Sequence, residues 1–463
     1  MHNLPAVFTV LGLCLSALSL PFALRWIPPN HALVGIALVV LALNAGCAPG
    51  GGGNAGWTTT EDTLPNGVLR VINTPPASGA PVTLEADEEL RIGGGDLGGP
   101  ASFGRIRQIA PLPDGRLAVL DGIGQEIRVF DAGGAHEGTF GGTGGGPGEM
   151  RDAQGLLLGP DGLLHVPDKR NARLSYFDPD SGFVRSRRFR VYTTRIRGPW
   201  IAAVDSTGRT VVWSSGPYRG GSWLMVRVYD QDMVQVDSIP YLDYTGLGAR
   251  RLQEQGVWWL TTPNGMRGTL PIPFYAGEQF VLDPTGQLWT TEAGASTLKV
   301  SRWWPAGDTT LVLESRRRPR PVPDAERDSV IAGIRSRFSS WPTPPRLDFG
   351  EIPRNEPPTY GLSLDDRGRL WVRLSSAGAD TTAYDVFDPD GRHAETVVVH
   401  ARVDSDIPPS LRGDTLWAVV RDELDVQYVI KARLKRPPTA ADLDSSTARI
   451  RRSGTSAPAP ASA

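Results

Sequence analysis

The sequence has almost no cysteine. Only Cys14 and Cys47 are present, and both lie within the first 47 residues of the 463-residue chain. The chain beyond Cys47 therefore contains no disulfide and no thiol nucleophile. This scarcity fits an exported protein and a cytosolic one equally well, so any argument about export has to come from the N-terminal leader.

An excess of charge of one sign is also missing. The chain has 48 Lys and Arg residues against 50 Asp and Glu residues, which gives a formal net charge of −2. Domains that bind nucleic acid usually show a clear basic excess, because they neutralise phosphates. We therefore expect no nucleic-acid partner.

Recognisable catalytic and metal-binding patterns are absent as well. No Ser-His-Asp order is found, and no two of the histidines after Cys47 lie at metal-ligand spacing. His165 occupies an alternating position in an expected strand, where a structural role competes with a catalytic one. The glycine-rich run Gly141–Gly148 is not followed by Gly-Lys-Ser/Thr, so it favours a flexible loop over a phosphate cradle. We expect no cofactor and no metal, and a binding protein rather than an enzyme.

What the sequence does contain is a repeat. Residues 114–121 and 161–168 both read D-G-x-L-x-V-x-D, and Phe-Asp pairs at 130–131 and 177–178 close the two copies. The offsets 161−114, 168−121 and 178−131 are all 47. Asp-Gly forms tight turns, and the alternation that follows places Leu117 and Val119 on one face of a strand. Strand-rich repeats of about 40–50 residues are typical of β-propeller blades.

The repeat continues along the chain. Its turn glycines are Gly115, Gly162, Gly208, Gly286, Gly368 and Gly413, separated by 47, 46, 78, 82 and 45 residues. We therefore predict an all-β fold, a six-bladed β-propeller over residues 67–436 with a lipoprotein-type leader and a short helical insertion. A seventh or eighth blade hidden in the two long steps is the alternative.

Two insertions account for the long steps better than extra blades do. Residues 241–272 show little strand alternation, and residues 315–358 contain a Pro-Asp-Ala-Glu-Arg helix start at 323–327. The apolar spacing of Val330, Ile331, Ile334 and Phe338 predicts an amphipathic helix of about four turns. Because the insertions follow consecutive blades, we expect both to emerge on one rim of the ring.

Residues outside the repeats form the ends of the propeller. Val68–Ile92 is strand-like, and we predict that it pairs with blade 6 near Leu416–Leu434 and closes the ring. Residues 48–66 are expected to be a flexible tether. Residues 437–463 are rich in Pro, Ala, Ser and Arg without periodicity, which predicts disorder.

The first 47 residues form a leader. Two apolar runs, Leu4–Leu24 and Ala32–Leu43, precede Ala45-Gly46-Cys47 and a glycine linker. This ending resembles a bacterial lipoprotein signal, in which the cysteine is lipidated and becomes the mature N-terminus, although Asn44 stands where that pattern usually has Leu. A plain signal peptide and a membrane anchor remain alternatives. Leu4–Leu24 is explained either by an upstream start codon or by a first membrane span.

The chain from about Val68 to Leu434 resembles six-bladed propellers with NHL-type repeats. The similarity is carried by the D-G-x-L-x-V-x-D core, by residues 168–178 and by the G-G-G-P-G-E-M loop at 144–150. It is greatest to uncharacterised lipoprotein-like bacterial propellers, in which V-P-D-A-E-R-D at 322–328 and D-E-L-D-V at 422–426 have counterparts. The resemblance implies a fold and leaves function open.

Two functional classes remain open. The first is an exported, lipid-anchored, monomeric scaffold that binds an envelope protein or a small molecule, at the membrane of the periplasm or the cell surface. The second is a metal-dependent enzyme, similar to propeller lactonases or lyases, with its site at the central channel. The candidate residues are Cys47 for lipidation and Trp258, Arg335, Lys169 and Arg170 for ligand binding. A packing role for Trp258, and a turn role for the Lys169–Arg170 loop, are the structural alternatives.

Overall fold

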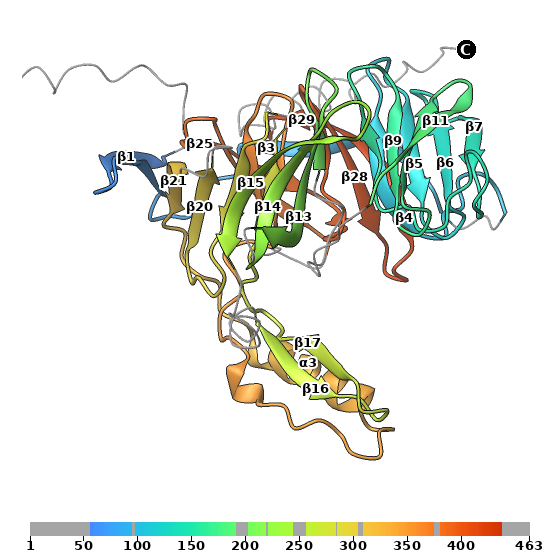
Figure 1. Ribbon diagram of the computed structural model, residues 1–463. Helices are drawn as coiled ribbons and strands as arrows, with labels where there is room; N and C mark the ends of the chain where they lie inside the picture. Colours follow the sequence, from blue (N-terminus) through green and yellow to red (C-terminus); the bar gives the residue numbers. More distant parts are fainter. Residues whose placement is uncertain are drawn as a thin grey trace, which may run out of the picture. The chain divides into compact units, whose positions relative to one another are not determined.

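The computed structural model describes residues 56–94, 98–190, 202–218, 221–243, 256–283, 285–303, 309–374 and 380–437. Within these ranges the chain is almost entirely β-strand, with one α-helix, α3 (Asp324–Arg337), and one short 3-10 helix, η1 (Phe349–Glu351) (Figure 1). No helix in these ranges is long and apolar enough to cross a membrane. The predicted all-β class with a short helical insertion is therefore confirmed.

The strands form six four-stranded antiparallel units, which we call blades 1 to 6. Blade 1 contains β4 (Ile106–Pro111), β5 (Leu117–Asp121), β6 (Glu126–Phe130) and β7 (His136–Gly141). Blade 2 contains β8 (Leu157–Leu158), β9 (Leu164–Asp168), β10 (Arg173–Asp178) and β11 (Gly182–Arg188). Blade 3 contains β12 (Ala202–Val204), β13 (Thr210–Tyr218), β14 (Gly221–Tyr229) and β15 (Gln235–Asp243).

The second half of the ring follows the same order. Blade 4 contains β18 (Phe280–Leu282), β19 (Leu288–Thr291), β20 (Leu298–Trp303) and β21 (Thr309–Ser315). Blade 5 contains β22 (Gly361–Leu364), β23 (Leu370–Arg373), β24 (Thr382–Phe387) and β25 (His393–Val399). Blade 6 contains β26 (Arg402–Val403) and β27 (Ser410–Arg412) side by side on β28 (Thr415–Arg421), then β29 (Gln427–Lys435) and the N-terminal strand β3 (Leu84–Ile92).

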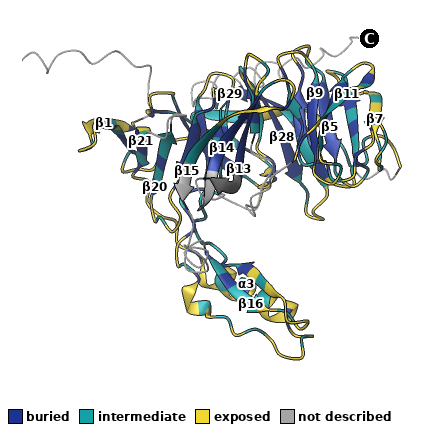
Figure 2. Cartoon of the chain, viewed as in Figure 1, coloured by how far each residue is buried: buried dark blue, intermediate teal, exposed yellow. Residues whose placement is uncertain are grey.

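Six hydrophobic clusters join these blades into a closed ring, because each cluster draws residues from two consecutive blades. Strand β5 shows how the alternation in the sequence produces this arrangement. Leu117 and Val119 belong to the cluster shared with blade 6, whereas Ala118 and Leu120 belong to the cluster shared with blade 2. Both faces of the strand are therefore buried, as Figure 2 shows for β5, β9 and β28.

The ring is closed by β3, as predicted. Ile92 pairs with Val429, and the antiparallel register continues to Glu85 opposite Lys435. The strand made early in the chain thus becomes the outermost strand of the last blade, and the six-blade count holds with no blade hidden in the long steps.

The same prediction was wrong for the first part of Val68–Ile92. Strand β2 (Leu69–Thr74) pairs in parallel with β21 of blade 4, and β1 (Thr58–Thr63) pairs with β2. The buried side chain of Asn73 explains this position, since its Nδ2 donates to the carbonyl of Gly391 at 2.8 Å and its Oδ1 accepts from the amide of His393 at 2.8 Å. Strand β1 also shows that the predicted tether 48–66 is ordered in its second half.

The antiparallel order sorts all connections onto two faces of the ring. Connections between the first and second strands of a blade, and between the third and fourth, lie on one face, which we call the turn face. Connections between the second and third strands, and between consecutive blades, lie on the other, which we call the loop face. The turn face carries the predicted repeat glycines, all at positive φ: Gly115, Gly162, Gly208, Gly286, Gly368 and Gly413.

Both insertions belong to the loop face, because they connect blade 3 to blade 4 and blade 4 to blade 5. The first contains the hairpin β16 (Val257–Thr261) and β17 (Arg267–Pro271), so the expectation of little strand structure there was wrong. The second contains α3, as predicted. The two insertions share one hydrophobic cluster that includes Trp258, Ile331, Phe338 and Ile352, and we call residues 256–277 with 324–352 the insertion module.

Candidate functional site

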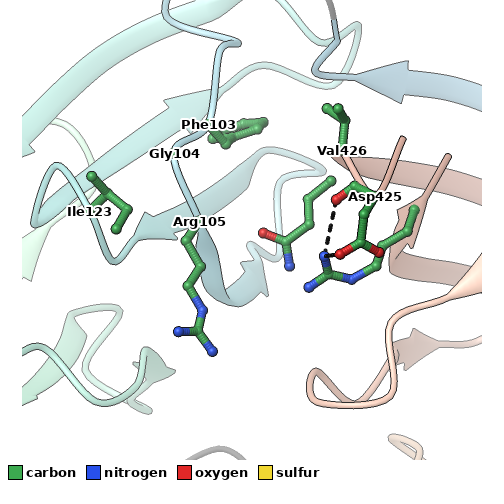
Figure 3. Close-up of a pocket in the computed structure, with 8 residues that line it drawn as sticks. Phe103, Gly104, Arg105, Ile123, Asp425 and Val426 are labelled. Carbon is green, nitrogen blue, oxygen red and sulfur yellow. Dashed lines mark hydrogen bonds and ion pairs between the residues drawn. The ribbon is translucent and has the colours of Figure 1, made fainter. Parts of the chain in front are cut away.

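A pocket of 420 Å³ opens on the loop face between blades 6 and 1. Three segments line it: the connection from β3 to β4, the loop from β5 to β6, and the loop from β28 to β29 (Figure 3). The lining residues are Phe103, Gly104, Arg105, Ile123, Arg421, Asp425, Val426 and Gln427. The volume suits a small molecule.

The repeat aspartate that ends β5 holds two of these segments together. The carboxylate of Asp121 is 1% exposed and accepts hydrogen bonds from the backbone amides of Gly104 at 2.8 Å, Arg105 at 3.1 Å and Ile123 at 2.9 Å. The last Asp of the D-G-x-L-x-V-x-D motif therefore positions loop-face backbone, because its acceptor oxygens satisfy amides that no strand pairs.

The equivalent aspartate in blade 2 does the same work. Asp168 accepts from the amides of Arg151 at 3.0 Å and Asp152 at 3.1 Å, and from Nδ2 of Asn171. The candidate residues Lys169 and Arg170 follow Asp168 and are exposed. At the repeat offset of 47 they correspond to Gly122 and Ile123, so they occupy in blade 2 the loop that lines the pocket in blade 1.

The blade 6 wall of the pocket is an ordered ionic network. Arg421 donates to the buried carboxylate of Asp404 at 2.7 Å and to Asp425 at 3.0 Å. Gln427 donates to Asp404 at 2.7 Å and accepts from the amide of Ile106 at 2.7 Å, which joins blade 6 to blade 1. Asp425 has φ = +66°, a conformation that ion pairs with Arg421 and Arg402 hold in place.

The blade 1 wall carries positive charge without matching acid. Among the described residues, the guanidinium of Arg105 has no hydrogen-bond or ion-pair partner, and Figure 3 shows it apart from the Arg421–Asp425 pair. Arg107, two residues further along the chain, has a buried Nε with no acceptor in the described chain. Burial lowers the pKa of Arg107, the nearby charge of Arg105 lowers it further, and Asp152 acts in the opposite direction.

Local backbone geometry explains how Arg107 reaches this position. The β4–β5 register shifts between Ile106 and Gln108, which leaves Arg107 as the extra residue of a β-bulge. Its side chain lies on the backbone of Gly122, where an added Cβ would come within 2.5 Å of the Arg107 Cγ. The bulge and the missing side chain at position 122 together aim Arg107 toward the loop face.

The structure brings Trp258 and Arg335 together in the insertion module. Trp258 is 5% exposed and meets Phe349 edge-on, with ring centroids 5.8 Å apart. The guanidinium of Arg335 lies 5.2 Å from the centre of the same ring and is exposed. Trp258 thus packs in the core of the module, whereas Arg335 remains available on its surface. Arg250 and Arg251, which accompany Trp258 in the sequence, lie outside the described residues, as does Cys47.

His165 has the environment of a strand residue. It is buried, its Nε2 lies 3.3 Å from Oδ1 of Asp161, and it meets Tyr176 edge-on. Burial lowers its pKa despite the opposing effect of Asp161. Within the described ranges, no group of three His, Cys, Asp or Glu residues is placed to hold a metal ion.

Sequence reasoning missed the pocket, because its walls lie more than 300 residues apart along the chain. One signal was present: the D-E-L-D-V stretch at 422–426 had been noted for its resemblance to other propellers, and it supplies Asp425 and Val426. Nothing in the sequence shows which arginines lack an acidic partner, so Arg105 and Arg107 could not be singled out.

The strand order and the six inter-blade clusters define the class: the chain folds as a six-bladed β-propeller. No family model matches the sequence, and no curated protein is similar to it in sequence. Among solved structures, it is similar to a protein from Bacteroides fragilis proposed to be exported, with 12% identity, 76% of this chain and 96% of that chain covered, and a TM-score of 0.43.

Two other solved structures show the same degree of likeness. A member of the DUF4221 family from Bacteroides vulgatus has 11% identity, covers 77% of this chain and 99% of its own, and has a TM-score of 0.41. Virginiamycin B lyase from Staphylococcus aureus has 13% identity, covers 76% and 99%, and has a TM-score of 0.36. The fold assignment therefore rests on the topology and packing of this chain.

Proposed function

We propose that this protein is an exported propeller, anchored to a membrane through a lipid on Cys47, that acts as a binding scaffold at the cell envelope through its loop face. One observation carries the proposal. The pocket, the insertion module and the basic loop at Lys169 and Arg170 all belong to loop-face connections, whereas the turn face is built of short Asp-Gly turns.

The distribution has a physical meaning. A tight turn needs four residues and satisfies its own backbone, so the turn face carries little chain beyond what joining the strands requires. The loop face holds two inserted segments, exposed arginines and aromatic residues on a rigid ring. Recognition surfaces are commonly built this way, because the ring fixes the loops while the loops vary in chemistry.

Site-specific crosslinking tests the proposal. A photoreactive amino acid would replace Lys169 or Arg335 on the loop face, with Asp180 and Asp390, both exposed in turn-face hairpins, as matched positions. We expect crosslinks to an envelope component in intact cells from the loop-face positions and none from the turn-face positions. Crosslinks from Asp180 or Asp390 alone, or none from any position, would contradict the proposal.

A further inference from the structure

The pocket between blades 6 and 1 places unpaired positive charge beside exposed apolar side chains. We propose that it binds a small organic anion, in which a carboxylate or phosphate group is joined directly to an apolar group. The inference rests on the proposed binding function and names the class of ligand that this part of the loop face takes.

The positive end of the pocket is formed by Arg105 and Arg107. Arg421 cannot serve as the anion's main partner, because Asp404 and Asp425 already neutralise it. Arg105 has no acidic partner among the described residues, and the buried Nε of Arg107 has no acceptor there. A buried donor without an acceptor is costly, so an incoming oxyanion that accepts from it gains a charge-assisted hydrogen bond.

Carboxylate and phosphate both match this charge. A guanidinium presents its donors in a planar fork that fits two oxygens of either group. The acid nearest in effect to Arg107 is Asp152, which forms no ion pair with it within the described chain, so the acid reduces but does not cancel the charge. Asp425 faces the pocket with both oxygens engaged by arginines, which limits its repulsion of a second anion.

The apolar end is formed by side chains that are unusually open for their type. Ile123 is 68% exposed and Val426 is 40% exposed, and both line the pocket. Phe103 completes this side, and its ring is fixed edge-on against Phe130 at 5.9 Å and under the guanidinium of Arg128 at 5.6 Å. Leu424, 84% exposed, belongs to the same β28–β29 loop as Val426.

Exposed apolar side chains at a charged pocket favour a ligand that is itself amphipathic. Burying such side chains against an apolar group releases water, at about 25 cal/mol for each Å² covered. The ionic wall of Arg421, Asp404 and Gln427 is already ordered, so little of the binding energy is needed to arrange the site. The 420 Å³ volume admits a small molecule and excludes a folded partner.

Calorimetric titration of the full-length protein in detergent, with detergent alone as the blank, tests this proposal. The probes are phenyl phosphate, phenylacetate, the neutral phenylmethanol and inorganic phosphate. We expect at least one phenyl anion to bind at least tenfold more tightly than phenylmethanol. The stronger of the two anions identifies phosphate or carboxylate as the preferred group.

Variants separate charge from apolar contact. Arg105→Ala should weaken the phenyl anion at least tenfold, whereas Arg187→Ala, an exposed arginine on β11 paired with Asp232, should leave it unchanged. Ile123→Ser should weaken the phenyl anion but not inorganic phosphate. Melting curves of all three variants should overlay that of the wild type, because Arg105, Ile123 and Arg187 are solvent-exposed.

Equal binding of phenylmethanol, no binding of either anion, or equal loss in Arg187→Ala would overturn the proposal. These results are distinct from failure of the scaffold function. If the anions do not bind but loop-face crosslinks persist, the ligand class is wrong and the scaffold stands. If the anions bind and the crosslinks are absent, the pocket is real and the scaffold role fails.

Discussion

Arg317 donates two hydrogen bonds, each 2.7 Å long, to the carboxylate of Asp385 in β24. Asp385 is 1% exposed, and Nε2 of the buried His393 lies 3.5 Å from its Oδ1. Trp57 stacks on His393 with ring centroids 3.8 Å apart and planes 11° apart. The chain segment that follows the leader is thus held against blade 5 by a buried ionic and aromatic network.

Breaking this ion pair should destabilise the propeller. Asp385→Ala leaves the guanidinium of Arg317 without its partner, and we expect a loss of about 3 kcal/mol in the free energy of unfolding, measured by urea denaturation. The matched control is Arg392→Ala, which removes an exposed pair with Glu61 and should cost at most about 1 kcal/mol. Equal effects of the two substitutions would show that the network is not a stabilising contact.

The contribution of Asp385 should also depend on pH. Burial alone would raise its pKa, but hydrogen bonds from His393 and Arg317 outweigh burial and hold the pKa below its usual value. A lowered pKa in the folded state stabilises the protein above the unfolded pKa of about 3.9, and this stability is lost as pH falls toward the folded value. The difference in unfolding free energy between wild type and Asp385→Asn should therefore be constant above about pH 5 and shrink below about pH 4. A difference that grows on acidification would contradict this.

Ring closure by β3 predicts a graded response to N-terminal deletion. A chain beginning at Leu64 loses only β1, which lies at a sheet edge, and should remain soluble with cooperative unfolding. A chain beginning at Gly93 also loses β3 and exposes the edge of β29, which invites aggregation. Light scattering and thermal unfolding measure both effects. Cooperative folding of the chain that begins at Gly93 would sink the closure argument.

Lipidation predicts a specific result for Cys47→Ser. The substitution should block processing or release the protein from membranes, because the thiol is the attachment point in the signal that the leader resembles. Fractionation after a carbonate wash, with wild type alongside, gives the measurement. If the variant stays with the membrane, Leu4–Leu24 becomes the anchor and lipidation is not required.

The core of the insertion module predicts a local effect for Trp258→Ala. Removing this 5%-exposed ring should cost about 3–5 kcal/mol of stability within the module. Its cluster contains no residue of the six ring clusters, so amide exchange should speed up in β16, β17 and α3 and stay unchanged in the blades. Met266→Ala, 61% exposed at the hairpin, is the control and should alter neither. Faster exchange across the blades would mean that the module supports the ring.

Several features of the fold were predictable because they depend on neighbours in the sequence. Asp114-Gly115 makes a turn through its own backbone and a positive φ of 92° at the glycine. The alternation of Leu117 and Val119 with Ala118 and Leu120 produces a strand buried on both faces, and the apolar spacing near Ile331 produces α3. Repetition of one local pattern then specified the number of blades.

Partner choice between distant segments was not predictable in the same way. Strands β2 and β3 have similar apolar patterns, yet β2 joins blade 4 in parallel and β3 joins blade 6 in antiparallel order. The difference comes from Asn73, whose buried amide is satisfied only beside Gly391 and His393, more than 300 residues away. A buried polar group selects its neighbour by geometry, which no local pattern encodes.

The sequence by itself determined the turns, the strands, the six-fold repeat and the presence of two insertions, since these follow from backbone preferences and short-range periodicity. Only the tertiary structure decided where function is concentrated. Ring closure brings Arg105 and Ile123 of blade 1 beside Asp425 and Val426 of blade 6, and it leaves Arg105 without an acid while Arg421 has two. Whether a charge is paired depends on distances across the closed ring, and those distances exist only after the last blade has taken up the strand from the N-terminal segment.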